Sequence, residues 1–203
     1  MTNNADRRVP PQILEGMKDQ VRRTLETIER FDLDAIGSLV EKLHEAYSTG
    51  KRVFIFGNGG SAAAASHFTE DLGKGILKDI SVTRRLRVQC LADSVPLITA
   101  LGNDCGYDSV FREQLITNAT PGDIAIAVSG SGNSPNVLRA IEWARESGLF
   151  TCGFTGFNGG KLKGLVDLCI HAGIADMEVA ENCHAVAMHL VTSALRQRLQ
   201  MGA

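Results

Sequence analysis

VFIFGNGGS, residues 53–61, is the stretch that decides the fold. Its first four residues are all apolar, a pattern typical of a strand buried on both faces of a sheet. The glycine-rich turn follows at once, and the alanine-rich residues 62–65 continue it as a helix. A buried strand, a glycine turn and a helix in this order predict the opening unit of a parallel sheet.

The same order recurs along the rest of the chain. Further apolar runs, which we expect to be strands, lie at residues 86–91, 123–128, 149–154 and 167–171. Near-continuous apolar strands need cover on both faces, because each crossover helix hides only one of them. We therefore expect a doubly wound α/β fold with a mainly parallel five-stranded sheet and flanking helices.

Helices are also expected before and after this sheet. Apolar residues at spacings of three and four predict an amphipathic helix over residues 12–30. Asp32 or Asp34 then caps a second helix that ends at Gly50. Residues 176–200 contain no proline or glycine and predict a long, largely buried C-terminal helix.

Length and charge set further limits. The 203 residues show no linker, so we expect one domain over residues 1–203. Residues 12–50 form its N-terminal helical extension, which packs on a sheet face or on a partner subunit. The formal charge of −2 comes from 23 acidic and 21 basic residues spread along the chain, which predicts no nucleic-acid partner and no membrane partner.

Cysteine usage and the N-terminus indicate a compartment. The five cysteines include no C-x-x-C pair, which favours reduced core residues over disulfides or a zinc-thiolate site. Residues 1–11 are polar, and no apolar run approaches the roughly 18 residues of a membrane span. The sequence therefore predicts a cytoplasmic protein.

The first turn, residues 57–61, has more than one interpretation. Free N–H groups at a helix N-terminus behind a parallel strand predict an anion site. With Ala62 the turn also fits the G-x-G-x-x-A variant of a dinucleotide fingerprint, which requires an acid about 20 residues further on, at the end of the next strand. The second strand ends near Asp93 instead, and Asp79 lies in a loop. Nicotinamide binding is therefore disfavoured, and glycines that serve only a tight turn remain an alternative.

The second turn has the composition of a phosphate cradle. It reads SGSGNSP over residues 129–135, and Ser134 with Pro135 predicts a helix N-terminus directly behind it. Short hydroxyls and free N–H groups suit a dianionic phosphate, and the lack of a Walker lysine argues against a nucleoside triphosphate. A plain polar turn is the alternative. The third turn, residues 155–160, is compatible with a purely connective role.

Two predicted helices carry histidines and acids at helical spacing. His67 and Asp71 are four residues apart, Glu181 and His184 are three apart, and His189 lies eight beyond Glu181. Such spacings place side chains on one helical face. Each histidine alone is more typical of a polar core residue than of a ligand. Two imidazoles and two carboxylates from separate helices, however, suit zinc or a similar divalent ion.

The paired motifs G-N-G-G-S and S-x-S-G-N-S, about 70 residues apart, resemble the phosphosugar-binding domain of the SIS (sugar isomerase) family. Gly102-Asn103-Asp104 and the T-G-x-x-G-G turn at residues 155–160 are similar to those of its phosphoheptose isomerase branch. The resemblance covers nearly the whole chain. It implies the SIS fold, a homotetramer with active sites at subunit boundaries, and conversion of D-sedoheptulose 7-phosphate to D-glycero-D-manno-heptose 7-phosphate.

The resemblance also implies which residues bind the substrate. The phosphate ligands are Ser129, Ser131 and Ser134. The residues near the sugar are Asn58, Gly59, Ser61, Asn103, Asp104, Asp176 and Glu181. The family usually has S-T-S-G-N-S in the phosphate loop, whereas Gly130 replaces the threonine here, so one hydroxyl contact is missing.

A metal and an acid–base pair are implied as well. The expected ligands of a divalent ion, with zinc as the first choice, are His67, Asp71, Glu181 and His189. Asp71 is the expected base and His189 the expected acid, with Glu70 as an alternative base. The family has glutamate at position 71 and glutamine at position 181. Aspartate is one methylene shorter, and a displacement of about 1 Å can cost on the order of 100-fold in rate.

Two other functions remain open at this point. One is a non-catalytic SIS phosphosugar-binding or regulatory protein, similar to the replication-initiator-associating relatives of this branch. The substitutions at Asp71 and Glu181 favour it, whereas the two histidines favour an enzyme. The other alternative is an isomerase of a different phosphosugar, because the sequence does not locate the side chains that set sugar length.

Overall fold

Five parallel strands form one sheet in the structure, a computed structural model that describes residues 9–201. The strands are β1 (Arg52–Gly57), β2 (Arg87–Cys90), β3 (Ile124–Ser129), β4 (Phe150–Thr155) and β5 (Leu168–His171). Their order is β2-β1-β3-β4-β5, and every neighbouring pair is parallel. The expected α/β fold with five parallel strands is confirmed. Residues 1–8 and 202–203 of the expected domain lie outside the described residues.

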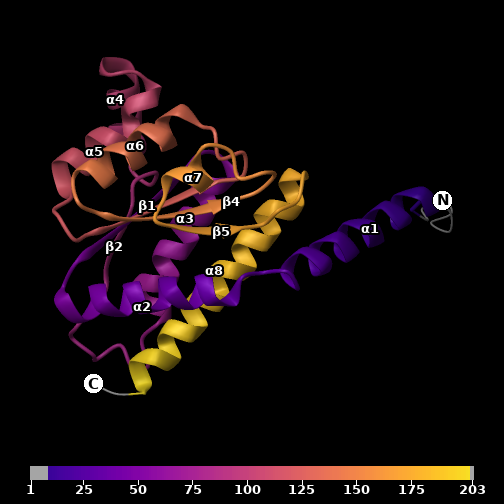
Figure 1. Cartoon of the computed structure of the whole chain (residues 1–203), viewed down its shortest axis with the longest axis horizontal. Coiled ribbons are helices and arrows are strands. Elements are labelled where there is room, and N and C mark those ends of the chain that lie inside the picture. Colours follow the sequence, from indigo (N-terminus) through magenta and orange to yellow (C-terminus); the bar gives the residue numbers. More distant parts are fainter. Residues whose placement is uncertain (1–8, 202–203) are drawn as a thin grey trace, which may run out of the picture.

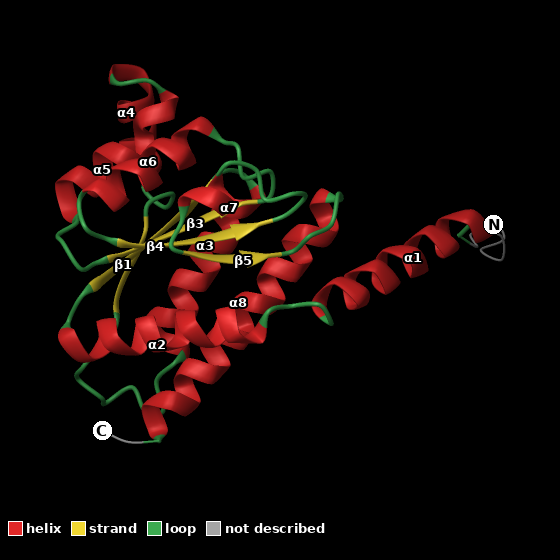
Figure 2. Ribbon diagram, viewed as in Figure 1, coloured by secondary structure: helices red, strands yellow, loops and turns green. Residues whose placement is uncertain are grey.

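Helices cover both faces of the sheet (Figure 1). One face carries α2 (Leu33–Thr49), α3 (Gly60–Glu70) and α8 (Met177–Gln200). The other carries α5 (Val110–Asn118), α6 (Pro135–Glu146) and α7 (Leu162–Leu165), with α4 (Val95–Asp104) beyond them. Val53 and Phe54 of β1 belong to opposite cores, because successive strand side chains point to opposite faces. Figure 2 shows the resulting layers of helix, sheet and helix.

The two N-terminal helices differ in how much they pack. Helix α2 begins after Asp32, whose side chain accepts a hydrogen bond from the Ala35 N–H at 3.0 Å, and ends at Gly50 with φ of 73°. Asp32 and not Asp34 is therefore the cap. Helix α1 (Pro11–Ile28) ends two residues earlier than expected and extends away from the body (Figure 1).

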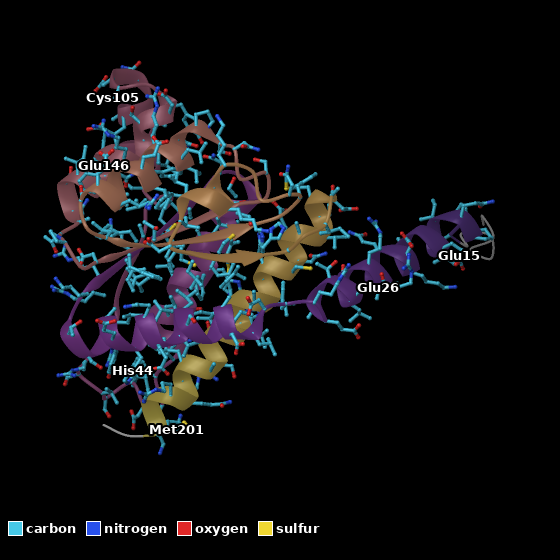
Figure 3. The ribbon with its side chains drawn as sticks, in the orientation of Figure 1. Glu15, Glu26, His44, Cys105, Glu146 and Met201 are labelled. Carbon is cyan, nitrogen blue, oxygen red and sulfur yellow. The ribbon has the colours of Figure 1, made fainter. Side chains whose placement is uncertain are left out.

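Helix α1 leaves most of its apolar face exposed. The residues of this face are 44–60% exposed and are Ile13, Leu14, Met17, Val21 and Leu25. Glu15 and Glu26, labelled in Figure 3, lie on this helix. In a single chain this face therefore lacks a packing partner among the described residues.

Two further expectations concern the whole chain. Within residues 9–201, no helix is both long enough and apolar enough to cross a membrane. All five cysteines are free thiols, as expected. Burial raises the pKa of the Cys90 thiol to about 12 and that of Cys152 further still, so both stay protonated and unreactive at neutral pH.

The strand order creates a switch point between β1 and β3. The chain runs from β1 outward to β2 and then returns to β3 on the other side of β1. Gly57 at the end of β1 pairs with Val128 near the end of β3, so the loops after these strands leave the same edge together. Ligands of open α/β sheets bind at such a point. The first and second turns of the sequence therefore meet where a substrate site is expected.

Candidate active site

A part-buried amide pair joins the first loop to the first turn of α6, directly after the phosphate loop. Asn58 Nδ2 donates to Asn136 Oδ1 at 2.9 Å, and Asn136 Nδ2 donates back to Asn58 Oδ1 at 2.8 Å. The Tyr107 hydroxyl also donates to Asn58 Oδ1, at 2.9 Å. Sequence reasoning did not single out Asn136 or Tyr107, since neither belongs to a spacing pattern. The pair holds the first loop against the start of α6.

The phosphate loop, residues 129–134, is folded back on itself. The Gly132 N–H donates to the carbonyl oxygen of Ser129 at 3.0 Å and to its Oγ at 3.2 Å. Ser131 Oγ accepts from the Asn133 N–H at 3.3 Å. Ser134 is the N-cap residue of α6, but its hydroxyl makes no capping bond and remains open to a ligand. The loop thus carries three serine hydroxyls and ends at a helix N-terminus.

The third turn supports the phosphate loop directly. The Gly156 N–H donates to the Gly130 carbonyl at 2.8 Å, and the Leu162 N–H donates to the Gly132 carbonyl at 3.0 Å. Gly132 has φ of 64°, and a Cβ there would overlap the Gly159 carbonyl oxygen. The turn therefore does more than connect β4 to α7, since its backbone interlocks with the loop that it contacts.

Glu181 lies over the start of α3. A Cβ at Gly60 would be 2.5 Å from Glu181 Oε1, so this side chain rests against the first turn of that helix. A carboxylate is favoured there by the positive end of the helix dipole. Ser61, in the same turn, is buried, and Gly59 before it has φ of 53°. Glu181 is therefore near the first loop and does not join the histidine group described next.

Three side chains converge about two helical turns beyond the start of α3. They are His67 of α3, Asp71 directly after this helix, and His189 of α8. The Nε2 atoms of His67 and His189 lie 3.9 Å and 3.6 Å from Asp71 Oδ2, and one ligand atom of each residue lies within 4.8 Å of the others. Asp71 begins a π-helical segment, Asp71–Gly75, which continues α3. Such segments are frequent at functional sites.

The group has the features of a divalent metal site. Asp71 Oδ2 is buried and accepts no hydrogen bond within the described chain, although both imidazoles face it. A buried carboxylate oxygen without a donor is costly unless a cation or proton satisfies it. Two imidazole nitrogens and one carboxylate form a donor set that zinc accepts. The residues present therefore fit a divalent ion.

Other expected site residues are engaged elsewhere. Asn103 Nδ2 donates to Asp104 Oδ1 at 2.8 Å, and both residues are exposed at the end of α4. Asp176 caps α8 by accepting from the Val179 N–H at 3.1 Å and pairs with Arg23 at 2.6 Å. These two contacts hold the pKa of Asp176 below its ordinary value. None of these contacts involves the phosphate loop.

Comparison with known proteins identifies the family. The family model described as "SIS domain" matches residues 18–156, which is more than half of the chain. The chain belongs to the SIS domain family. A relative from Geobacter sulfurreducens named phosphoheptose isomerase is 36% identical over 179 residues, covering 88% of this chain and 93% of the relative. Another of that name, from Rhodospirillum rubrum, is 39% identical over 150 residues, covering 74% of this chain and 78% of the relative.

A solved structure supports the same fold. The structure of a phosphoheptose isomerase from Francisella tularensis matches with a TM-score of 0.82 at 25% identity, covering 92% of this chain and 97% of that chain. The expected SIS fold is confirmed by this match.

His184 is a core residue of this SIS domain. It is 1% exposed, and neither of its ring nitrogens has a hydrogen-bond partner within the described chain. Its ring lies edge-on to Phe154, with the centroids 6.0 Å apart. Burial lowers the pKa of His184 from its ordinary value of 6.5, so the imidazole is neutral at neutral pH.

This buried imidazole predicts acid sensitivity. Below pH 6.5 the unfolded chain protonates His184 more readily than the native state does, so the free energy of unfolding falls as the pH drops. One extra proton bound by the unfolded state changes the free energy of unfolding by at most about 1.4 kcal/mol per pH unit. We expect His184→Leu to flatten the slope, as measured by urea unfolding between about pH 5 and 7.5. An unchanged slope in His184→Leu would contradict the assignment.

Proposed function

We propose that this chain is a phosphoheptose isomerase that converts D-sedoheptulose 7-phosphate to D-glycero-D-manno-heptose 7-phosphate. One observation carries the proposal. The serine-rich loop lies at the switch point between β1 and β3, and α3 starts at the same edge of the sheet. Further along α3, His67, Asp71 and His189 form a group that can hold a metal ion. Relatives that are 36–39% identical and bear this name support it.

The substrate phosphate is bound by the loop after β3. Ser129, Ser131 and Ser134 supply hydroxyls, and the open hydroxyl at the start of α6 is best placed for a charge-assisted hydrogen bond. The sugar extends from there along the first loop, between α3 and α8. The residues proposed to contact it are Asn58, Gly59, Ser61, Asn103, Asp104, Asp176 and Glu181.

The proton transfer takes place at the other end of the sugar. Asp71 takes a proton from C1, beside the C2 carbonyl, and returns it to C2. His189 protonates the C2 oxygen as the acid and regains a proton from the C1 hydroxyl, which becomes the aldehyde oxygen. His67, Asp71 and His189 would hold a divalent ion, with zinc as the first choice and Glu181 as the proposed fourth ligand. When bound, this ion holds substrate oxygens and polarises the carbonyl. Glu70 is a weaker candidate for the base, because it pairs with Lys74 at 3.6 Å.

Assembly into a homotetramer with active sites at subunit boundaries belongs to the proposal. The exposed apolar face of α1 needs cover, and the exposed Asn103 and Asp104 reach a substrate more readily across a boundary. Five free cysteines suit the reducing cytoplasm as the location.

One assay tests the proposal. Metal-loaded protein is incubated with sedoheptulose 7-phosphate, and the aldose phosphate is followed by NMR beside a sample treated with a chelator. We expect turnover that chelation abolishes. Folded, metal-loaded protein without turnover would contradict the proposal. A panel with fructose and arabinose phosphates would then separate an isomerase of another sugar from a binding protein.

A further inference from the structure

Met177 occupies space beside the phosphate loop that no other side chain fills. A Cβ at Gly130 would lie 2.5 Å from Met177 Sδ and 3.3 Å from Met177 Cε. The thioether therefore packs directly on the bare backbone of Gly130, which is itself buried.

Two anchors fix the position from which Met177 reaches the loop. It is the first residue of α8, and Asp176 before it caps the helix through the Val179 N–H. Arg23 of α1 holds the same carboxylate at 2.6 Å. On the loop side, the Gly130 carbonyl accepts from the Gly156 N–H at 2.8 Å. Both partners of the contact thus belong to backbone that is held in place.

We propose that Met177 is a binding residue of the phosphate site, where its thioether forms an apolar wall beside Gly130 and raises the affinity for phosphate. This inference rests on the proposed function, because it assumes that the loop binds phosphate. A thioether donates no hydrogen bond, so the bound phosphate depends on the serine hydroxyls and backbone N–H groups alone. The wall excludes water from one side of the loop and so strengthens those hydrogen bonds. Met177 is 39% exposed, which leaves it in reach of a ligand.

A double-mutant cycle between the two residues tests the proposal. Met177→Ala removes the wall, and we expect the Kd of inorganic phosphate and the KM of the phosphosugar to rise about fivefold with kcat unchanged. In Gly130→Ser the new Cβ displaces the flexible thioether, because the two cannot share the space. Met177→Ala should therefore change the phosphate Kd by less than about twofold in the Gly130→Ser background.

The control lies at the other end of the same helix. Met201 is 82% exposed, far from the loop (Figure 3), and Met201→Ala should leave the phosphate Kd and the KM unchanged. Equal effects of Met177→Ala in both backgrounds, or no effect on the wild-type Kd, would overturn the proposal. Calorimetry with inorganic phosphate needs no turnover. Suppose that the effects of Met177→Ala and Gly130→Ser on the phosphate Kd are coupled as predicted, but the protein does not isomerise the sugar phosphate. This result would support the role of Met177 and contradict the proposed function.

Discussion

Asp71→Asn is expected to lower the kcat of isomerisation by about 10²–10⁴-fold, the range that a general base contributes. The amide cannot accept the substrate proton, although it has the same shape as the carboxylate. Asp71 Oδ2 faces both imidazoles at 3.6–3.9 Å, so the substitution removes the only carboxylate of the group. The measurement is initial rate with sedoheptulose 7-phosphate, together with the metal content of each preparation.

Three controls make this result specific. In the proposed function phosphate binds at the serine loop. Its Kd should therefore stay within about twofold of wild type in Asp71→Asn, because that loop is unchanged. Glu70→Gln changes the neighbouring carboxylate, which is exposed and pairs with Lys74, and should retain full activity. Asp71→Glu keeps a carboxylate on a side chain one methylene longer and should retain more activity than Asp71→Asn. Unchanged turnover in metal-loaded Asp71→Asn would remove Asp71 from the mechanism.

The fold was predictable from the sequence because its signals are local. Each strand is a short apolar run, and both layers of helices follow from the need to cover two apolar faces. The place of the site followed as well, since the glycine turn after β1 and the serine turn after β3 meet at the switch point. The pairing of His67 with Asp71 depends only on helical spacing, and it is present.

Contacts between distant segments were not predictable in this way. Asn58 and Asn136 are 78 residues apart, and nothing in either motif indicates that they bond to each other. Helical spacing grouped Glu181 with His189. Spacing predicts which side chains share a helical face, but it does not predict the rotamer that each side chain adopts. The Glu181 carboxylate rests against Gly60 instead, toward the start of α3. Its place among metal ligands therefore remains a prediction.

Gly132→Ala is expected to destabilise the protein and abolish phosphate binding. Gly132 has φ of 64°, which costs a residue with a Cβ about 1–2 kcal/mol, and the added Cβ would also overlap the Gly159 carbonyl. Backbone cannot move aside as a flexible side chain can, so the total cost is about 3 kcal/mol or more. At about 2–4 °C per kcal/mol for a chain of this size, the Tm should fall by about 6–12 °C.

The matched control is Gly164→Ala in α7, where no atom lies within 4 Å of the new Cβ. Alanine is favoured over glycine in a helix, so this variant should keep or slightly raise the Tm. Scanning calorimetry gives both values, and titration with inorganic phosphate reports the loop. Because Gly132 touches neither Asp71 nor the histidines, metal binding by Gly132→Ala should persist wherever the variant is folded. A normal Tm with normal phosphate affinity would show that the third turn does not interlock with the phosphate loop.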